Sequence, residues 1–132
     1  MSYIATNPKR LLDTSVGNGQ CVAYVQAAAM TGQTRRWSRG ELVQGAKLAI
    51  GTAIATFDDN GKYISDTHGQ SHAAIYMGQD AVGIQVLDQW VSKTKDKKGV
   101  ISLIVTPVHP RTIYFRNAKA AVDDGRNYYV IE

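Results

Sequence analysis

Cysteine is almost absent from this sequence of 132 residues, and the only one, Cys21, excludes an intramolecular disulfide and any disulfide-based scaffold. No CxxC, HExxH, Walker or GxGxxG pattern occurs, so we expect neither a metal site nor a cofactor. No apolar run approaches the roughly 20 residues of a membrane span. The N-terminal residues MSYIATNPKRLLD lack the apolar core of a secretory signal. We therefore expect synthesis in the cytoplasm and, if the protein acts outside its cell, a different export route.

The composition is that of one globular domain. Hydrophobic residues make up 44% and charged residues 20% of the chain, and a domain of this length folds without disulfides or metal. We expect a single domain over residues 1–132. The net charge is +4, and its one dense cluster, KTKDKK at 93–98, is predicted to be a solvated loop. No nucleic-acid-binding pattern accompanies this cluster, so we expect no nucleic-acid partner.

Helices are predicted in the first third of the chain. Residues 17–20, Gly-Asn-Gly-Gln, are a loop signal. The next ten, CVAYVQAAAM, contain strong helix formers and no glycine or proline, so we expect a helix over 21–30. A second short helix is expected from Ser38, because Ser38 and Glu41 have capping-box spacing ahead of LVQGAKL.

Strands are predicted in the remainder of the chain. Their order, after the helices and with short connections, indicates an α+β fold in which N-terminal helices pack on an antiparallel sheet of about six strands. The predicted strands are 51–57, 72–77, 83–90, 100–106, 111–115 and 127–131, with 61–65 as a further short candidate.

Cys21 is a candidate nucleophile because of its position. A cysteine in the first helical turn meets the positive end of the helix dipole, which stabilises a thiolate. The free N–H groups of that turn can also hold the oxyanion formed when a carbonyl is attacked. A lone cysteine is, however, often a small buried hydrophobic residue, so its neighbours have to decide.

Three histidines could act as the base for a cysteine nucleophile. His109 lies between two prolines, in a predicted surface loop, and His68 lies in another loop. His72 opens a predicted strand, which gives a rigid position, and we prefer it over His68. The ring needs an acceptor on its other nitrogen. Asp88 lies sixteen residues on, in the next strand, and Gln89 would replace it if the register shifted by one residue.

At these residues the sequence resembles a known family. The segments GNGQCVAYVQ, GTAIATF, HGQSHAAIYMG and VLDQW are similar to the NlpC/P60 and CHAP cysteine amidases, and most of all to the small amidase effectors of type VI secretion. The resemblance implies a papain-like fold, with Cys21 as nucleophile, His72 as base and Asp88 as the orienting residue. It covers residues 15–92 well and the C-terminal strands only in outline.

The resemblance also implies a substrate and partners. The substrate would be a peptidoglycan stem peptide or the diaminopimelate–D-Ala cross-bridge, of which the cross-bridge is preferred. Delivery would be by type VI secretion into the periplasm of a rival bacterium, with a cognate immunity protein that occludes the cleft. Residues expected along the substrate-binding side are Trp90, Gln89, Gly19, Gln20, Trp37 and His68.

Two alternatives remain open from the sequence. The first is a phage-type endolysin domain with the same chemistry. The second is a non-enzymatic module that binds an acidic glycan or protein through Trp37, Trp90, Arg35 and Arg36. The second alternative predicts that replacing Cys21 leaves function unchanged.

Overall fold

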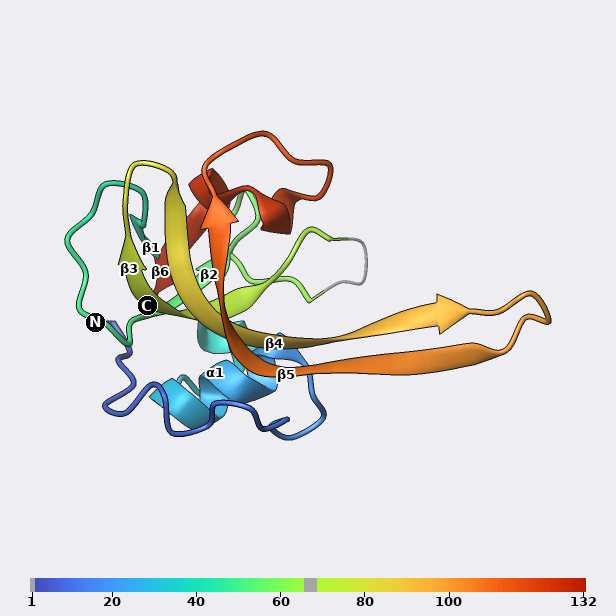
Figure 1. Ribbon diagram of the computed structural model, residues 1–132. Coiled ribbons are helices and arrows are strands. Elements are labelled where there is room, and N and C mark those ends of the chain that lie inside the picture. The colour runs from blue at the N-terminus through green and yellow to red at the C-terminus, as the bar shows by residue number, and fades with distance from the viewer. Residues whose placement is uncertain (1, 66–68) are drawn as a thin grey trace.

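In the computed structural model, which describes residues 2–65 and 69–132, a six-stranded sheet carries one α-helix (Figure 1). Every neighbouring pair of strands is antiparallel, and the spatial order is β1-β6-β2-β3-β4-β5. The predicted antiparallel sheet of about six strands is therefore confirmed. The elements are α1 (Cys21–Ala29), η1 (Thr34–Arg36), β1 (Arg39–Leu42), β2 (Ala53–Thr56), β3 (Ala73–Gln79), β4 (Gly83–Lys95), β5 (Ile101–Tyr114), η2 (Ala121–Asp123), η3 (Gly125–Asn127) and β6 (Tyr128–Ile131).

The predicted first helix is confirmed as α1, which packs against β3 and β4. Tyr24 and Val25 of the helix are fully buried against Ile75 and Leu87 of the sheet. The helix ends at Met30, whose left-handed backbone (φ 55°) closes the last turn by donating its N–H to Gln26. This packing fixes the position of the first helical residue against the sheet.

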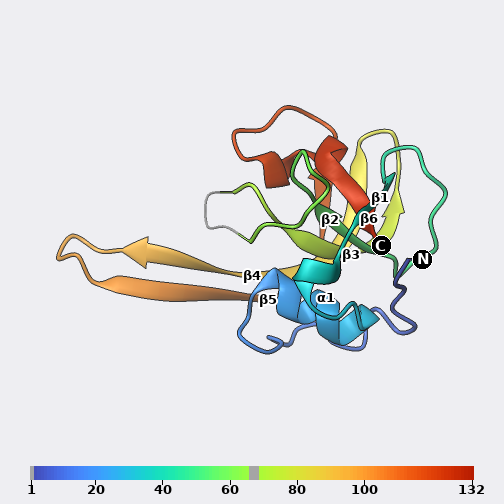
Figure 2. The same ribbon diagram turned by 180° about the vertical axis from the view of Figure 1, so that it is seen from behind.

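A second apolar cluster occupies the opposite face of the sheet. Alternation along each strand separates the two sets, since Ala73 and Ile75 belong to the helix side and Ala74 and Tyr76 to the other. Figures 1 and 2 show α1 on one side of the sheet and the segment with η2 and η3 on the other. The buried members of this second cluster are Val43, Ile54, Ala74, Tyr76, Ile84, Val86, Ile113, Tyr128 and Val130.

The predicted second helix is wrong. Residues 39–42 form the edge strand β1, which pairs with β6 at the end of the chain. Ser38 donates its N–H to the Glu132 carbonyl at 2.6 Å and accepts the Glu132 N–H at 2.8 Å. Gly45 has a φ of +81°, which a continuing helix does not allow. Pairing with a distant strand therefore overrides the local capping pattern.

The strands β4 and β5 are longer than predicted. The expected strands at 100–106 and 111–115 are one strand, β5, and β4 continues to Lys95, through part of the predicted lysine-rich loop. Pro107 and Pro110 do not interrupt β5 because it is at the edge of the sheet. Residues 61–65 are not a strand. Beyond the body of the sheet, β4 and β5 continue as a long hairpin (Figures 1 and 2).

Candidate active site

The loop before α1 is fastened to β4 by one buried side chain. Gln89 accepts the Val16 N–H through Oε1 at 2.8 Å, and its Nε2 donates to the carbonyls of Val16 (2.9 Å) and Gln20 (2.7 Å). The side chain of Gln89 is completely buried, so its end of each bond is shielded from water. They hold the residue that directly precedes Cys21 in a defined position.

Cys21 is the first residue of α1 and is half-buried. The preceding residue, Gln20, has an extended backbone and makes no side-chain cap hydrogen bond to the helix. The Sγ atom lies 3.9 Å from the hydroxyl of Tyr63, which is almost completely buried. The prediction that Cys21 lies at the N-terminus of a helix is therefore confirmed.

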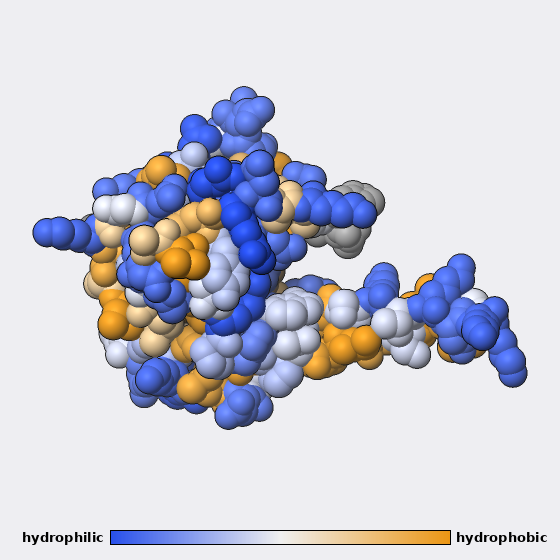
Figure 3. Space-filling view, turned by 45° about the horizontal axis from the view of Figure 1, so that its top comes forward, coloured by the Kyte–Doolittle hydropathy of each residue, from blue (hydrophilic) through white to orange (hydrophobic). Residues whose placement is uncertain are grey.

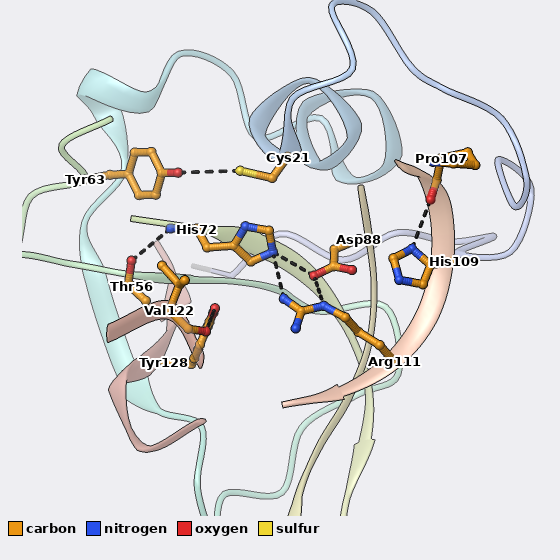
Figure 4. A network of polar contacts seen from close by, with 10 residues as sticks. All are labelled: Cys21, Thr56, Tyr63, His72, Asp88, Pro107, His109, Arg111, Val122 and Tyr128. Carbon is orange, nitrogen blue, oxygen red and sulfur yellow. Dashed lines mark hydrogen bonds and ion pairs between the residues drawn. The ribbon is translucent and has the colours of Figure 1, made fainter. Parts of the chain in front are cut away.

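His72 lies directly before β3, and its side chain is held between the sulfur and a carboxylate. Its backbone N–H donates to Thr56 Oγ1 at 3.1 Å, and only 7% of the residue is exposed. Nε2 is 2.7 Å from Asp88 Oδ2, and the other ring nitrogen points toward Cys21 (Figure 4). A bond between Nε2–H and the carboxylate leaves Nδ1 to exchange a proton with the thiol.

Asp88 is fully buried in β4 and accepts two hydrogen bonds at one oxygen. Arg111 of β5 donates its Nε–H to the same Oδ2 at 2.8 Å. An Arg111 terminal nitrogen lies 3.4 Å from His72 Nε2. Because Nε2–H already donates to Asp88, these two nitrogens are neighbouring donors around one carboxylate. The other oxygen, Oδ1, has no hydrogen-bond partner among the described residues.

This arrangement favours an ion pair between the thiol and the imidazole. Burial alone lowers the pKa of His72, but the hydrogen bonds to Asp88 and Cys21 outweigh it and raise the pKa to about 9. Burial also raises the pKa of the Cys21 thiol, yet the hydrogen bond and charge of His72 bring it below its usual value. A lowered thiol pKa beside a raised histidine pKa is the pattern of an activated nucleophile.

Cys21 and His72 lie in the wall of a cleft of about 610 Å³. Its walls include the loop before α1, the segment that carries Tyr63, and Trp90 of β4. Cys21 and His72 both line this cleft, so its chemistry rather than its shape identifies it as the candidate active site. Among the predicted substrate-binding residues, Gln20 and Trp90 line the cleft, whereas Gly19 does not and packs against Val91.

Gln89 and Trp37, also predicted on the substrate-binding side, do not line this cleft. Gln89 points to the loop at 16–20 and not to His72, which leaves Asp88 as the partner of the histidine. Trp37 is fully buried, donates its Nε1–H to the Thr31 carbonyl and packs on Tyr63, so it belongs to the core. His68 lies outside the described residues. His109 is part of β5, not of a loop, and packs on Trp90 at 5.0 Å between ring centroids.

Comparison with known proteins identifies the family of the chain. The family model of domesticated amidase effector 2 (Dae2) matches residues 2–131. The chain belongs to the Dae2 family. It is 46% identical over 93 residues to a type VI secretion amidase effector 2 protein of Salmonella typhi, covering 68% of each chain. It is 33% identical to domesticated amidase effector 2 of Ixodes scapularis, over 89% of this chain and 73% of the relative.

A solved structure extends the likeness to the fold. The chain superimposes on type 6 secretion amidase effector 2 (Tae2) with a TM-score of 0.77 and 34% identity, covering 98% of this chain and 94% of that one. The expectation of an amidase effector of the type VI kind, taken from the sequence, is therefore confirmed. Nothing among the residues 2–65 and 69–132 forms a helix long and apolar enough to cross a membrane.

Arg111 is a residue of this Dae2-family site that the sequence did not reveal. It lies in a predicted strand with no local motif, and it reaches Asp88 only because β5 pairs with β4. Its guanidinium also lies over the Trp90 ring, 5.1 Å from the centroid. The sequence gives only an indirect signal for Arg111, since a buried aspartate in a strand requires a partner of some kind.

Replacing Arg111 by methionine should shift the pH dependence of the site. Arg111 places a positive charge next to the imidazolium, so its removal should raise the pKa of His72 and move the alkaline limb of the activity profile upward. The measurement is kcat/KM against pH. Arg116→Met is the matched control, because Arg116 is exposed on the Tyr114 ring. An alkaline limb that stays in place in Arg111→Met would contradict this role.

Proposed function

We propose that Cys21, His72 and Asp88 are the nucleophile, the base and the orienting acid of an amidase that hydrolyses peptide bonds in peptidoglycan. The observation that carries this proposal is that Cys21 and His72 line one cleft while Nε2 of His72 lies 2.7 Å from the buried Asp88 carboxylate behind it. A buried aspartate, a histidine with a raised pKa and a thiol with a lowered pKa are expensive to maintain without a catalytic role.

The proposed reaction is acyl transfer in two steps. The Cys21 thiolate attacks the amide carbonyl, and a C–S bond forms. The oxyanion accepts hydrogen bonds from the Cys21 N–H and, in this proposal, from the Tyr63 hydroxyl next to the sulfur. His72 Nδ1–H protonates the leaving amine as the C–N bond breaks. Water then gives a proton to His72 and attacks the thioester, which releases the acid and restores the thiolate.

Family membership supports the biological setting. An amidase effector of the type VI kind acts on the cell wall of a competing bacterium, and this is the function expected from the sequence. We prefer it to a phage endolysin because the relatives that match most of the chain are amidase effectors. Release into the target periplasm and an immunity protein that fills the cleft at Cys21 and Trp90 are parts of the proposal.

Two finer points belong to the same proposal. The fold is taken to be a single papain-like NlpC/P60 domain over residues 1–132, since a cysteine-bearing helix packs on an antiparallel sheet that supplies the histidine. The bond taken to be cut is the diaminopimelate–D-Ala cross-bridge. The stem-peptide amide between D-Glu and diaminopimelate is the alternative.

Digestion of Gram-negative sacculi tests the proposal. Purified protein is incubated with sacculi, and the soluble fragments are analysed by mass spectrometry. Release of fragments whose masses correspond to uncross-linked stem peptides supports the cross-bridge, and shortened stem peptides indicate the alternative bond. If the folded protein releases no fragment of either kind, peptidoglycan hydrolysis is refuted and the binding-module interpretation gains support.

The rate should depend on pH as expected for a thiolate–imidazolium pair. The active form has a deprotonated Cys21 and a protonated His72, so kcat/KM should rise as the thiol ionises, at a pH below its ordinary range. The rate should fall again near pH 9, where His72 loses its proton. These limbs are apparent values of the coupled pair. An alkaline limb close to pH 6.5, the usual histidine value, would contradict the proposed pair.

A further inference from the structure

Residues 91–105 form a two-stranded ribbon that leaves the body of the molecule, and we call it the arm. Figures 1 and 2 show it projecting past the sheet in opposite views. Large apolar side chains are exposed on both of its faces, with 47% of Ile104 and 63% of Leu103 accessible. An isolated hairpin is only marginally stable in water. A long ribbon with exposed apolar side chains is therefore a surface that suits a bound partner.

The pairing register divides the arm into two faces of different chemistry. Residues directly opposite one another in an antiparallel pair lie on the same face, and the faces alternate along each strand. The first face, which we call the hydroxyl face, consists of the pairs Trp90–Thr106, Ser92–Ile104 and Thr94–Ser102. The second face, the lysine face, consists of the pairs Val91–Val105, Lys93–Leu103 and Lys95–Ile101.

The hydroxyl face begins at the catalytic cleft, whereas the start of the lysine face is covered. Trp90 belongs to both, because it lines the cleft with Cys21 and His72 and begins the hydroxyl face. At the base of the lysine face, Val91 packs so closely over Gly19 that an added Cβ there would lie 2.7 Å from Val91 Cγ2. The loop before α1 thus covers the start of the lysine face.

We propose that the hydroxyl face is a second binding subsite, which holds the peptidoglycan strand beyond the peptide bond in the cleft. This inference rests on the proposed function. The face offers four side-chain hydroxyls, which can donate to and accept from the hydroxyl and amide groups of a glycan or peptide. It also offers the part of Trp90 that lines the cleft, which can contact apolar atoms of the polymer. At about 3.4 Å per residue the face extends roughly 14 Å from Trp90 to Thr94.

The charge of the arm agrees with an anionic polymer as the occupant. The arm contains four lysines and one aspartate, which accounts for most of the net charge of +4. Figure 3 shows hydrophilic side chains gathered at its far end and apolar ones along its length. Peptidoglycan stem peptides carry carboxylates, so the lysines attract the polymer from a distance while the hydroxyl face fixes its path. If the arm bound a lipid surface instead, nothing would explain why the hydroxyl face begins at the cleft.

The test compares two double variants with the same change in charge. Ser92→Glu with Ser102→Glu places carboxylates on the hydroxyl face, at two exposed positions that are not opposite one another. Ile101→Glu with Leu103→Glu places them on the lysine face, opposite Lys95 and Lys93. Thermal unfolding first shows that both variants are folded. Pelleting with sacculi is then measured in the Cys21→Ala background, and hydrolysis in the Cys21 background.

The hydroxyl-face variant should pellet with sacculi about tenfold more weakly than the lysine-face control, because its new carboxylates meet those of the polymer. The ratio of kcat/KM for sacculi to that for a short cross-linked peptide without sugars should fall by a similar factor. It should fall much less in the control, which loses only the long-range attraction of the lysines. Equal losses in both variants, or no loss in the hydroxyl-face variant, would overturn the subsite.

Vesicles of phosphatidylethanolamine and phosphatidylglycerol test the remaining interpretation, which is that the arm binds a lipid surface. If the protein pellets with these vesicles and not with sacculi, and the lysine-face variant removes that binding, the arm is a lipid-binding element and the subsite is wrong. Failure of the unsubstituted protein to hydrolyse either sacculi or the short peptide would refute the proposed function instead. The pelleting measurement would still decide whether the hydroxyl face binds peptidoglycan.

Discussion

Replacing Cys21 by alanine should lower the hydrolysis of a cross-linked peptide by roughly 10⁴-fold or more, the scale expected when a nucleophile is removed. The loss follows from the mechanism, because no other cysteine is present and the thiolate forms the bond to the substrate carbonyl. The free energy of unfolding should change by only about 1 kcal/mol, since Cys21 is half-buried and alanine suits the first helical turn.

Both quantities are needed to interpret this variant. Activity is measured as kcat/KM on a purified cross-linked peptide, and stability by thermal or urea unfolding. A folded Cys21→Ala protein that retains activity within tenfold of the original would refute the nucleophile. An inactive protein that no longer folds would instead support a structural role for Cys21, the alternative that a lone cysteine always leaves open.

Replacing Asp88 should affect activity and stability together. Asp88→Ala removes a fully buried carboxylate and leaves Arg111 and His72 without their shared acceptor. We expect destabilisation by about 3 kcal/mol, at the low end for breaking a buried ion pair because 23% of the Arg111 side chain stays exposed. We also expect kcat/KM to fall by roughly 10³-fold, because the imidazole loses both its orientation and the charge that keeps it protonated.

Asp88→Asn separates the role of Asp88 as a hydrogen-bond acceptor from the role of its negative charge. Its carbonyl oxygen can still accept from His72 and Arg111, so stability should be closer to that of the original protein. The negative charge is gone, so the pKa of His72 should fall and the thiolate–imidazolium pair should become less populated. Activity that is lost in Asp88→Ala and fully kept in Asp88→Asn would show that Asp88 acts only as a structural acceptor.

The core of the site could be predicted because each residue has a local signal. Cys21 follows a glycine-rich loop at the start of an amphipathic stretch, His72 precedes an apolar strand, and Asp88 is a charged residue among buried strand neighbours. Because side chains alternate along a strand, Asp88 and Gln89 are expected on opposite faces of the sheet, and only one of them can face His72. The structure places the first at His72 and the second at the loop before α1.

The other parts of the site depend on distant pairing and have no local signal. Arg111 reaches Asp88 through the register of β4 and β5, and Tyr63 reaches Cys21 from an irregular segment 42 residues away in sequence. Neither residue sits in a motif. A sequence pattern can indicate that a buried charge needs a partner, but it does not say which of the chain's basic residues provides one.

The errors in the predicted fold have the same origin. The capping-box spacing of Ser38 and Glu41 is a local helix signal, but 39–42 pair with β6 at the other end of the chain. The two prolines in β5 suggested a break between strands, but an edge strand tolerates them. The length of the arm could not be predicted, because its lysines and serines are as typical of a solvated loop as of an exposed ribbon.

The most direct test of the account is the pH dependence of alkylation by iodoacetamide, since Cys21 is the only thiol in the protein. Because alkylation requires only the thiolate, its rate should rise at a pH below the ordinary thiol range and then stay level through pH 9, unlike turnover. His72→Ala should move the rise up toward the ordinary thiol pKa of about 8.5. A rise near pH 8.5 in the original protein, unchanged by His72→Ala, would contradict the thiolate–imidazolium pair at the centre of the proposed mechanism.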